Sequence, residues 1–181
     1  MGEGIRALFP ESARRIYVGK KAAQHTLKQD EINQLLVDLA REGLKVVRLK
    51  GGDPAIFGRA TEELSACRTI GVPAAICPGI TAASAAAASL SQSLTLRGLA
   101  RKLIFVTAHA RAGEAPDLDW TALADPQATL AIYMGKSAAG EVSRKLREAG
   151  LSPDTPVKLV ENISLPNERR IATRLDLLSL T

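Results

Sequence analysis

Residues 46–54 read Val46-Val47-Arg48-Leu49-Lys50-Gly51-Gly52-Asp53-Pro54. The β-branched and apolar residues at its start predict a buried strand over residues 45–49, and the two glycines and the proline predict a tight turn after it. Residues 60–70 then carry apolar side chains at helical spacing and end before Gly71. A strand, a glycine turn and a helix in this order are typical of a βα unit.

The same alternation of apolar runs and amphipathic stretches continues along most of the chain. Strands are predicted over residues 15–18, 45–49, 74–77, 103–107, 129–134, 157–160 and 170–174. Helices are predicted over residues 30–42, 60–70, 81–90 and 137–149. The pattern predicts an α/β fold with mostly parallel sheets. A polar connector at residues 91–101 predicts two lobes, residues 1–92 and residues 93–181.

Composition narrows the class of protein. The chain has 181 residues, of which 46% are apolar, which is typical of a globular protein. It contains no apolar run near the roughly 20 residues of a membrane helix, and its start lacks a signal-peptide pattern, so a cytoplasmic protein that does not enter the membrane is expected. Its only cysteines, Cys67 and Cys77, are expected to be reduced core residues, and no metal site is expected.

The positive net charge favours an anionic partner but does not identify its chemical class. The formal net charge is +5, but the basic residues are scattered and aromatic residues make up only 3% of the chain. Proteins that bind single-stranded nucleic acid stack bases on aromatic side chains within a basic groove, so a nucleic-acid partner is not expected. A small molecule that carries several carboxylates is compatible with the charge.

Four loops after predicted strands are unusual, and ligands of parallel α/β proteins bind at the carboxyl ends of strands. They are residues 51–54, 78–82, 133–135 and 161–164. In the first, the glycines allow a ligand to approach the backbone and Asp53 offers a carboxylate to an amine or to ribose hydroxyls. The second leads into a helix N-terminus with free N–H groups. Without a ligand, these features are an ordinary turn, a capped helix start and a core methionine.

Several segments together resemble the uroporphyrinogen-III C-methyltransferases of the tetrapyrrole methyltransferase family. They are residues 46–54, Phe57-Gly58-Arg59, residues 78–84, Tyr133-Met134-Gly135 and Val160-Glu161-Asn162, in the same order and at similar spacing. Tyr17-Val18-Gly19-Lys20-Lys21 and Arg97-Gly98-Leu99-Ala100 extend the match. The resemblance implies a two-lobed tetrapyrrole methylase fold, a homodimer, and S-adenosylmethionine bound in the cleft between the lobes. It implies methylation of uroporphyrinogen III to precorrin-2, for sirohaem and cobalamin biosynthesis.

The resemblance also implies roles for single residues. Lys20 matches a family lysine assigned as a proton donor. Contacts with the cofactor are implied for Gly51, Gly52, Asp53, Ile56, Thr81, Ala82, Met134 and Ile163. Methyl transfer from a sulfonium is an in-line displacement, so these residues would mainly hold the reactants in line. By chemistry alone, Arg48, Arg59 and Arg97 are candidates for binding the substrate's carboxylates, although each is otherwise an ordinary surface arginine.

The sequence also departs from the family pattern. The family's first strand and its Gly-Ala-Gly-Pro-Gly-Asp loop have no counterpart, and the chain stops before the family's last strand and helix. Ala55, Ala60-Thr61, Leu96 and Ile163 replace family residues, and a branched side chain at Ile163 is expected to crowd the adenosine pocket. We therefore expect an incomplete first lobe, with activity weakened or lost, or with the missing edge supplied by association.

Two other functions fit the sequence. A precorrin methyltransferase would share the fold and the cofactor but act on a later tetrapyrrole. Arg97-Gly98-Leu99-Ala100 and the uninterrupted Leu49-Lys50-Gly51-Gly52-Asp53-Pro54 favour the uroporphyrinogen branch over it. A remnant without catalytic activity would fold and bind a nucleotide-like ligand only. A DNA-binding protein is a distant third, because the positive charges form no stripe.

Overall fold

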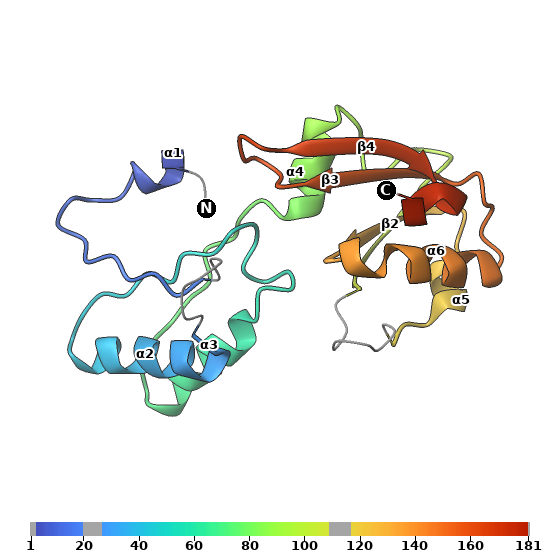
Figure 1. Cartoon of the computed structure of the whole chain (residues 1–181). Helices are drawn as coiled ribbons and strands as arrows, with labels where there is room; N and C mark the ends of the chain where they lie inside the picture. Colours follow the sequence, from blue (N-terminus) through green and yellow to red (C-terminus); the bar gives the residue numbers. More distant parts are fainter. Residues whose placement is uncertain (1–2, 20–26, 109–116, 181) are drawn as a thin grey trace. The chain divides into compact units, whose positions relative to one another are not determined.

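The computed structural model describes residues 3–19, 27–108 and 117–180. The chain divides into two compact units, Met1–Thr81 and Ala82–Thr181 (Figure 1). Each unit has its own packing, and each is described by itself below.

Helices dominate the described part of the first unit. They are α1 (Glu3–Arg6), α2 (Gln29–Arg41) and α3 (Ala60–Thr69), and α2 packs against α3. Ile32 and Val37 of α2 and Cys67 of α3 are buried. Gly43 and Gly71 follow the two longer helices with φ of +78° and +73°, the left-handed conformation that ends many helices. The helices predicted over residues 30–42 and 60–70 are confirmed.

Three predicted strands of the first unit are wrong. Residues 15–18, 45–49 and 74–77 are extended, but within the described part of the chain they form no ladder with a neighbour. Their apolar side chains are also open to solvent, with Val47 79% exposed and Ile76 41% exposed. A strand needs a hydrogen-bonded neighbour as well as a β-branched sequence, and the sequence pattern reports only on the second condition.

The second unit contains all the strands that the structure describes. Its elements in chain order are α4 (Ala82–Ser89), β1 (Lys102–Thr107), α5 (Trp120–Leu123), β2 (Ala128–Tyr133), η1 (Lys136–Ala138), α6 (Ala139–Glu148), β3 (Pro156–Glu161), β4 (Arg169–Arg174) and η2 (Leu175–Leu180). The strands predicted from residue 103 onward are confirmed, as is the helix over residues 81–90. The helix predicted over residues 137–149 begins as the 3₁₀ turn η1 and continues as α6. The short elements α5 and η2 were not predicted.

The strands of the second unit form two small sheets of opposite kind. β1 and β2 pair in parallel, from Lys102 opposite Ala128 to Thr107 opposite Tyr133. β3 and β4 pair antiparallel, because only residues 162–168 connect them and so short a connection returns the chain in the opposite direction. The fold is therefore mixed α/β as predicted, but the prediction of mostly parallel sheets is wrong for the described strands.

An apolar core lies between α6, η2 and the sheets. Val142 and Leu146 of α6 and Leu175 and Leu178 of η2 are among its buried members, at 2–7% exposure. Half-buried side chains from β1 and β2 pack against them. The Ser143 hydroxyl of α6 donates a hydrogen bond to the Leu175 carbonyl, so a polar bond also holds η2 onto α6 inside this core.

Three further features bear on the predictions from the sequence. None of the described helices has the length and apolar character needed to cross a membrane. Cys67 is buried and Cys77 is exposed, so the expectation of a core residue is wrong for Cys77. The boundary predicted between residues 92 and 93 stays a prediction, while the compact units divide between Thr81 and Ala82.

Replacement of Leu146 by alanine tests the core of the second unit. Leu146 is 3% exposed, so we expect Leu146→Ala to lower the free energy of unfolding by about 2–5 kcal/mol. Urea unfolding followed by the fluorescence of Trp120, which packs against the same core, measures this loss. Leu180 is 81% exposed, so Leu180→Ala is the control, with a change within about 0.5 kcal/mol. Equal losses for both variants would contradict this core.

Candidate functional site

The glycine turn after residue 50 is ordered by the Asp53 side chain. Gly52 has φ of +77°, a left-handed conformation that glycine adopts without strain. Asp53 Oδ1 accepts a hydrogen bond from the Ala55 N–H at 2.8 Å, and the Asp53 carbonyl accepts one from the Ile56 N–H at 3.2 Å. Gly51 lies at the open side of the turn, where an added methyl group would meet no atom of the described residues within 4 Å.

A second predicted loop lies against this turn. The Gly79 N–H donates to Asp53 Oδ2 at 3.4 Å, although the two residues are 26 positions apart. A methyl group at Gly79 would lie 2.3 Å from the Gly52 carbonyl oxygen, so the two backbones approach as closely as only glycine allows. The structure therefore brings together two loops that were predicted separately, one after residue 50 and one before Thr81.

The two candidate arginines of the first unit already bind carboxylates. Arg48 Nε contacts Glu63 Oε1 at 3.2 Å, and Arg48 Nη1 donates to the Leu49 carbonyl at 3.0 Å. Arg59 donates from Nε and Nη2 to the two Glu62 oxygens, both at 2.6 Å. These bonds from Arg59 lower the pKa of the Glu62 carboxyl. A substrate carboxylate would have to share or replace these partners.

In the second unit, the start of α4 meets the end of β2. The Ala83 N–H, one of the N–H groups that a helix start leaves without an intrahelical partner, donates to the Tyr133 hydroxyl at 3.1 Å. Met134 follows directly, with φ of +55° and 52% exposure. Gly135 is packed closely, because a methyl group there would lie 3.1 Å from Ile132 Cγ2.

Ion pairs order the turn between β3 and β4, which carries Ile163. Lys136, just after Gly135, binds Glu161 at the end of β3, and this hydrogen bond lowers the pKa of the Glu161 carboxyl.

Glu168 lies at the other end of this turn and has three hydrogen-bond donors. The Ser89 hydroxyl at the end of α4 donates to Glu168 Oε1. Glu168 also accepts from the Ser164 N–H at 2.8 Å and from Arg170 Nε at 2.7 Å. These three hydrogen bonds lower the pKa of Glu168 to about 2. The half-buried Ile163 therefore sits in a turn with a defined shape.

The predicted site residues fall into two groups. In the first unit are Arg48, Gly51, Gly52, Asp53, Ile56, Arg59 and Thr81; in the second are Ala82, Arg97, Met134 and Ile163. Arg97 is exposed in a turn that the Leu96 and Ala100 backbones close by hydrogen bonds of 2.9 Å. Lys20, the predicted catalytic residue, lies outside the described residues. The roles of all these residues stay predictions.

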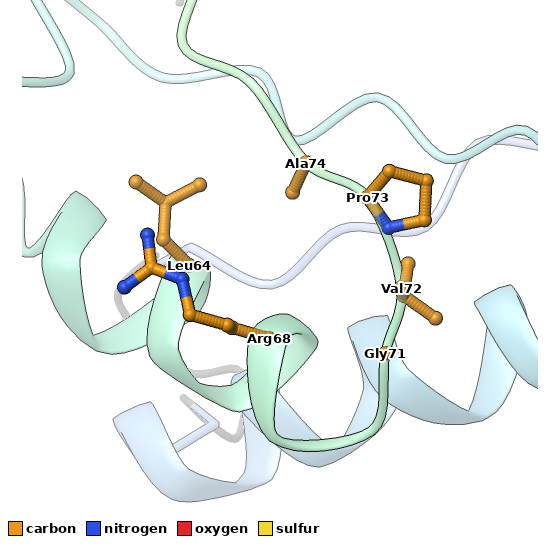
Figure 2. Close-up of a pocket in the computed structure, with 6 residues that line it drawn as sticks. All are labelled: Leu64, Arg68, Gly71, Val72, Pro73 and Ala74. Atoms are coloured by element: carbon orange, nitrogen blue, oxygen red, sulfur yellow. The ribbon is translucent and has the colours of Figure 1, made fainter.

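A shallow pocket in the first unit belongs to neither group. Its volume is about 320 Å³, and its lining consists of Leu64, Arg68, Gly71, Val72, Pro73 and Ala74 (Figure 2). Leu64 and Arg68 come from α3, and Ala74 projects toward them from the segment that follows the helix. Because none of the predicted site residues that the structure describes lines it, the pocket does not support the predicted cofactor site.

Reasoning from sequence missed the side chains that hold these loops. Glu63 has a signal that was available: it occupies an inward position of α3, three residues after the buried Ala60, where an acid requires a partner. The bonds from Ser89 to Glu168 and from Lys136 to Glu161 carry no comparable local signal, because these partners lie 79 and 25 positions apart. The Tyr133 hydroxyl was part of a quoted motif, but its bond to a helix start follows only from the tertiary structure.

The family model of the Tetrapyrrole (Corrin/Porphyrin) Methylases matches residues 2–178. The chain belongs to this family. Among relatives with a known name, the uroporphyrinogen-III C-methyltransferase of Paracoccus denitrificans is 49% identical over 175 residues, covering 97% of this chain and 61% of that protein. The siroheme synthase of Zymomonas mobilis is 46% identical over 172 residues, covering 95% of this chain and 36% of that protein. The chain thus spans less than two thirds of these tetrapyrrole methylases.

Solved structures of tetrapyrrole methylases share the fold. The uroporphyrin-III C-methyl transferase of Thermus thermophilus, complexed with S-adenyl homocysteine, has a TM-score of 0.81 and 36% identity over 98% of this chain and 74% of that chain. A cobalt precorrin-4 methyltransferase has a TM-score of 0.75 and 32% identity over 87% of this chain and 65% of that chain. The resemblance read from the sequence is therefore confirmed at the level of family and fold.

Replacement of Gly79 by alanine tests the close approach of the two loops. The new methyl group would collide with the Gly52 carbonyl, so we expect a loss of about 1–3 kcal/mol in the free energy of unfolding. Gly51→Ala is the matched control, because its methyl group enters open space, and a change within about 0.5 kcal/mol is expected. Far-ultraviolet circular dichroism during urea unfolding measures both. A Gly79→Ala variant as stable as the Gly51→Ala variant would refute the contact.

The Glu168 hydrogen bonds predict a dependence of stability on pH. The folded pKa of about 2 lies below the ordinary value of 4.5, so ionised Glu168 stabilises the fold above pH 4.5 and loses this effect as the pH falls toward 2. The difference in thermal midpoint between the native chain and Glu168→Gln should therefore shrink over that range. Glu42→Gln, at an exposed position after α2, is the control. A difference that does not change with pH would contradict the assignment.

Proposed function

We propose that this chain transfers methyl groups from S-adenosylmethionine to uroporphyrinogen III, giving precorrin-2 for sirohaem and cobalamin biosynthesis. Membership of the tetrapyrrole methylases supports the reaction class, and the names of the relatives at 49% and 46% identity support the substrate. The observation in the structure that carries the proposal is the bond between Asp53 and Gly79, which joins two of the predicted cofactor loops.

The glycine turn has the properties that a cofactor site requires. Gly51 leaves its surroundings open, so a ligand can approach the backbone closely. The carboxylate of Asp53 already accepts two N–H groups but has about four acceptor positions, so it can still accept hydrogen bonds from a ligand. Ile56, three positions after Asp53, and Thr81, two positions after Gly79, are both half-buried. In this proposal the turn binds the polar parts of the cofactor, whose sulfonium supplies the methyl group.

The second unit adds further proposed contacts. Ala82 begins α4, Met134 is exposed after β2, and Ile163 sits in the turn held by Glu168. These positions offer mainly apolar surface to a ligand. Lys20 stays the proposed proton donor, and its assignment rests on the family resemblance.

The substrate's carboxylates need cationic partners, and the net charge of +5 suits them. Arg97 is exposed in its turn, so we favour it as a substrate contact. Arg48 and Arg59 remain proposals, although carboxylates of the protein already bind both. By analogy with the family we further propose a homodimer in the cytoplasm, with no membrane or nucleic-acid partner.

A precorrin methyltransferase is the second candidate. The similarity to a cobalt precorrin-4 methyltransferase, at a TM-score of 0.75 and 32% identity, supports it. The two candidates share the cofactor and differ in the tetrapyrrole. Incubation with uroporphyrinogen III and S-adenosylmethionine separates them, because only the first gives a dimethylated product with red fluorescence after oxidation.

Calorimetric titration with S-adenosylhomocysteine tests the cofactor site. We expect the folded chain to bind this product, and we expect Asp53→Asn to bind it about tenfold more weakly, because hydrogen bonds to a charged acceptor are worth more than those to an amide. Asp117→Asn, at an exposed position of the second unit, is the control and should bind as the native chain does. No heat from the native chain at high micromolar ligand would refute the cofactor site. Binding without turnover would identify a remnant.

A further inference from the structure

Glu63 is a carboxylate buried inside the first unit. Only 7% of the residue is exposed, and it lies on the face of α3 that also buries Ala60 and Cys67. Three donors surround it: Lys50 Nζ is 2.6 Å from Oε2, and Arg48 Nε and Gln29 Nε2 are each 3.2 Å from Oε1. A buried carboxylate without such partners would be strongly unfavourable, so this cluster is a condition of the local fold.

The cluster differs from an ordinary surface ion pair. The side chains of Lys50 and Glu63 are 12% and 9% exposed, whereas those of the neighbouring Arg59–Glu62 pair are 57% and 43% exposed. Exposed pairs contribute little, but removal of one partner of a buried pair leaves an uncompensated charge. The Lys50–Glu63 pair is therefore the contact whose loss this region tolerates least.

The cluster acts on the segment that enters the glycine turn. Arg48 and Lys50 point to the same side because side chains alternate along an extended chain, and Lys50 directly precedes Gly51. Residues 44–50 have no sheet neighbour among the described residues, so no ladder of backbone hydrogen bonds sets their position. Side-chain bonds to Glu63 take over this task, and Gln29 connects the same carboxylate to α2.

We infer that Glu63 is a positioning residue for the glycine turn. Through Lys50 it sets the point from which Gly51, Gly52 and Asp53 leave the extended segment, while Gly79 holds the same turn from the other loop. The inference deepens the proposed function and rests on the glycine turn being part of the cofactor site. Glu63 itself does not contact the cofactor in this scheme.

Glu63→Gln tests the inference, since it keeps the size of the side chain and removes its charge. We expect binding of S-adenosylhomocysteine to weaken about tenfold, because a displaced turn no longer matches the ligand. If the chain turns over, KM for S-adenosylmethionine should rise while kcat changes little. Amide hydrogen exchange in residues 51–56 should become faster, whereas exchange in residues 36–41 of α2, which belongs to the same unit, should not change. A loss of stability of the whole first unit would accelerate exchange in both.

Variants of Lys50 test whether the effect of Glu63→Gln on binding comes from the loss of the Lys50–Glu63 ion pair. Lys50→Met should weaken binding as much as Glu63→Gln does, and the double variant should lose no more than either single variant, because both remove the same interaction. Lys50→Arg keeps the charge and should retain most of the binding. The matched control is Glu141→Gln, which removes a helix carboxylate from an exposed pair with Arg144 and should bind as the native chain does.

The outcomes are distinguishable. If the native chain does not bind S-adenosylhomocysteine, the proposed function fails, and exchange in residues 51–56 of Glu63→Gln still decides whether Glu63 positions the turn. If the native chain binds but Glu63→Gln and Lys50→Met stay within about twofold of it, this inference is overturned and the proposed function stands. Should Glu63→Gln not fold, Lys50→Met alone decides.

Discussion

The contact between the Asp53 carboxylate and the Gly79 N–H is the constraint on which the candidate site of the first unit depends. It joins two loops 26 residues apart, and the close approach requires a glycine at position 79, because a methyl group there would lie 2.3 Å from the Gly52 carbonyl oxygen. The same carboxylate closes its own turn through the Ala55 N–H. The Asp53 side chain thus holds the shape of the glycine turn and also binds the loop that carries Gly79.

The buried carboxylate of Glu63 binds the segment that precedes the glycine turn. The segment before the turn lacks a sheet ladder among the described residues, and Lys50 and Arg48 bind Glu63 instead. The segment held by the buried ion pair therefore ends at Lys50, and the glycine turn begins at the next residue, Gly51. The exposed apolar side chains of the same segment, such as Val47, show that apolar burial contributes little to its position.

In the second unit, an apolar core and polar bonds hold the loops that carry the candidate residues. Its helices and sheets share an apolar core, and polar bonds at the edges fix the loops: Ala83 to Tyr133, Lys136 to Glu161, and Ser89 to Glu168. The candidate residues Met134 and Ile163 lie on the loops that these bonds order. In both units, residues outside the predicted contacts, such as Glu63, Tyr133 and Glu168, help to hold the loops that carry the candidate residues. This arrangement is consistent with a tetrapyrrole methylase whose chemistry depends mainly on positioning.

The sequence by itself determined the family, the longer helices and the strands from residue 103 onward, because apolar periodicity, helix-ending glycines and the Gly51-Gly52-Asp53-Pro54 turn are local signals. Only the tertiary structure decided that residues 15–18, 45–49 and 74–77 have no sheet partner among the described residues, that β3 and β4 run antiparallel, and that Arg48 binds Glu63. Pairing of strands and burial of charges join residues distant in sequence. A local pattern can show that a segment is suited to such a partner, but it does not contain the partner.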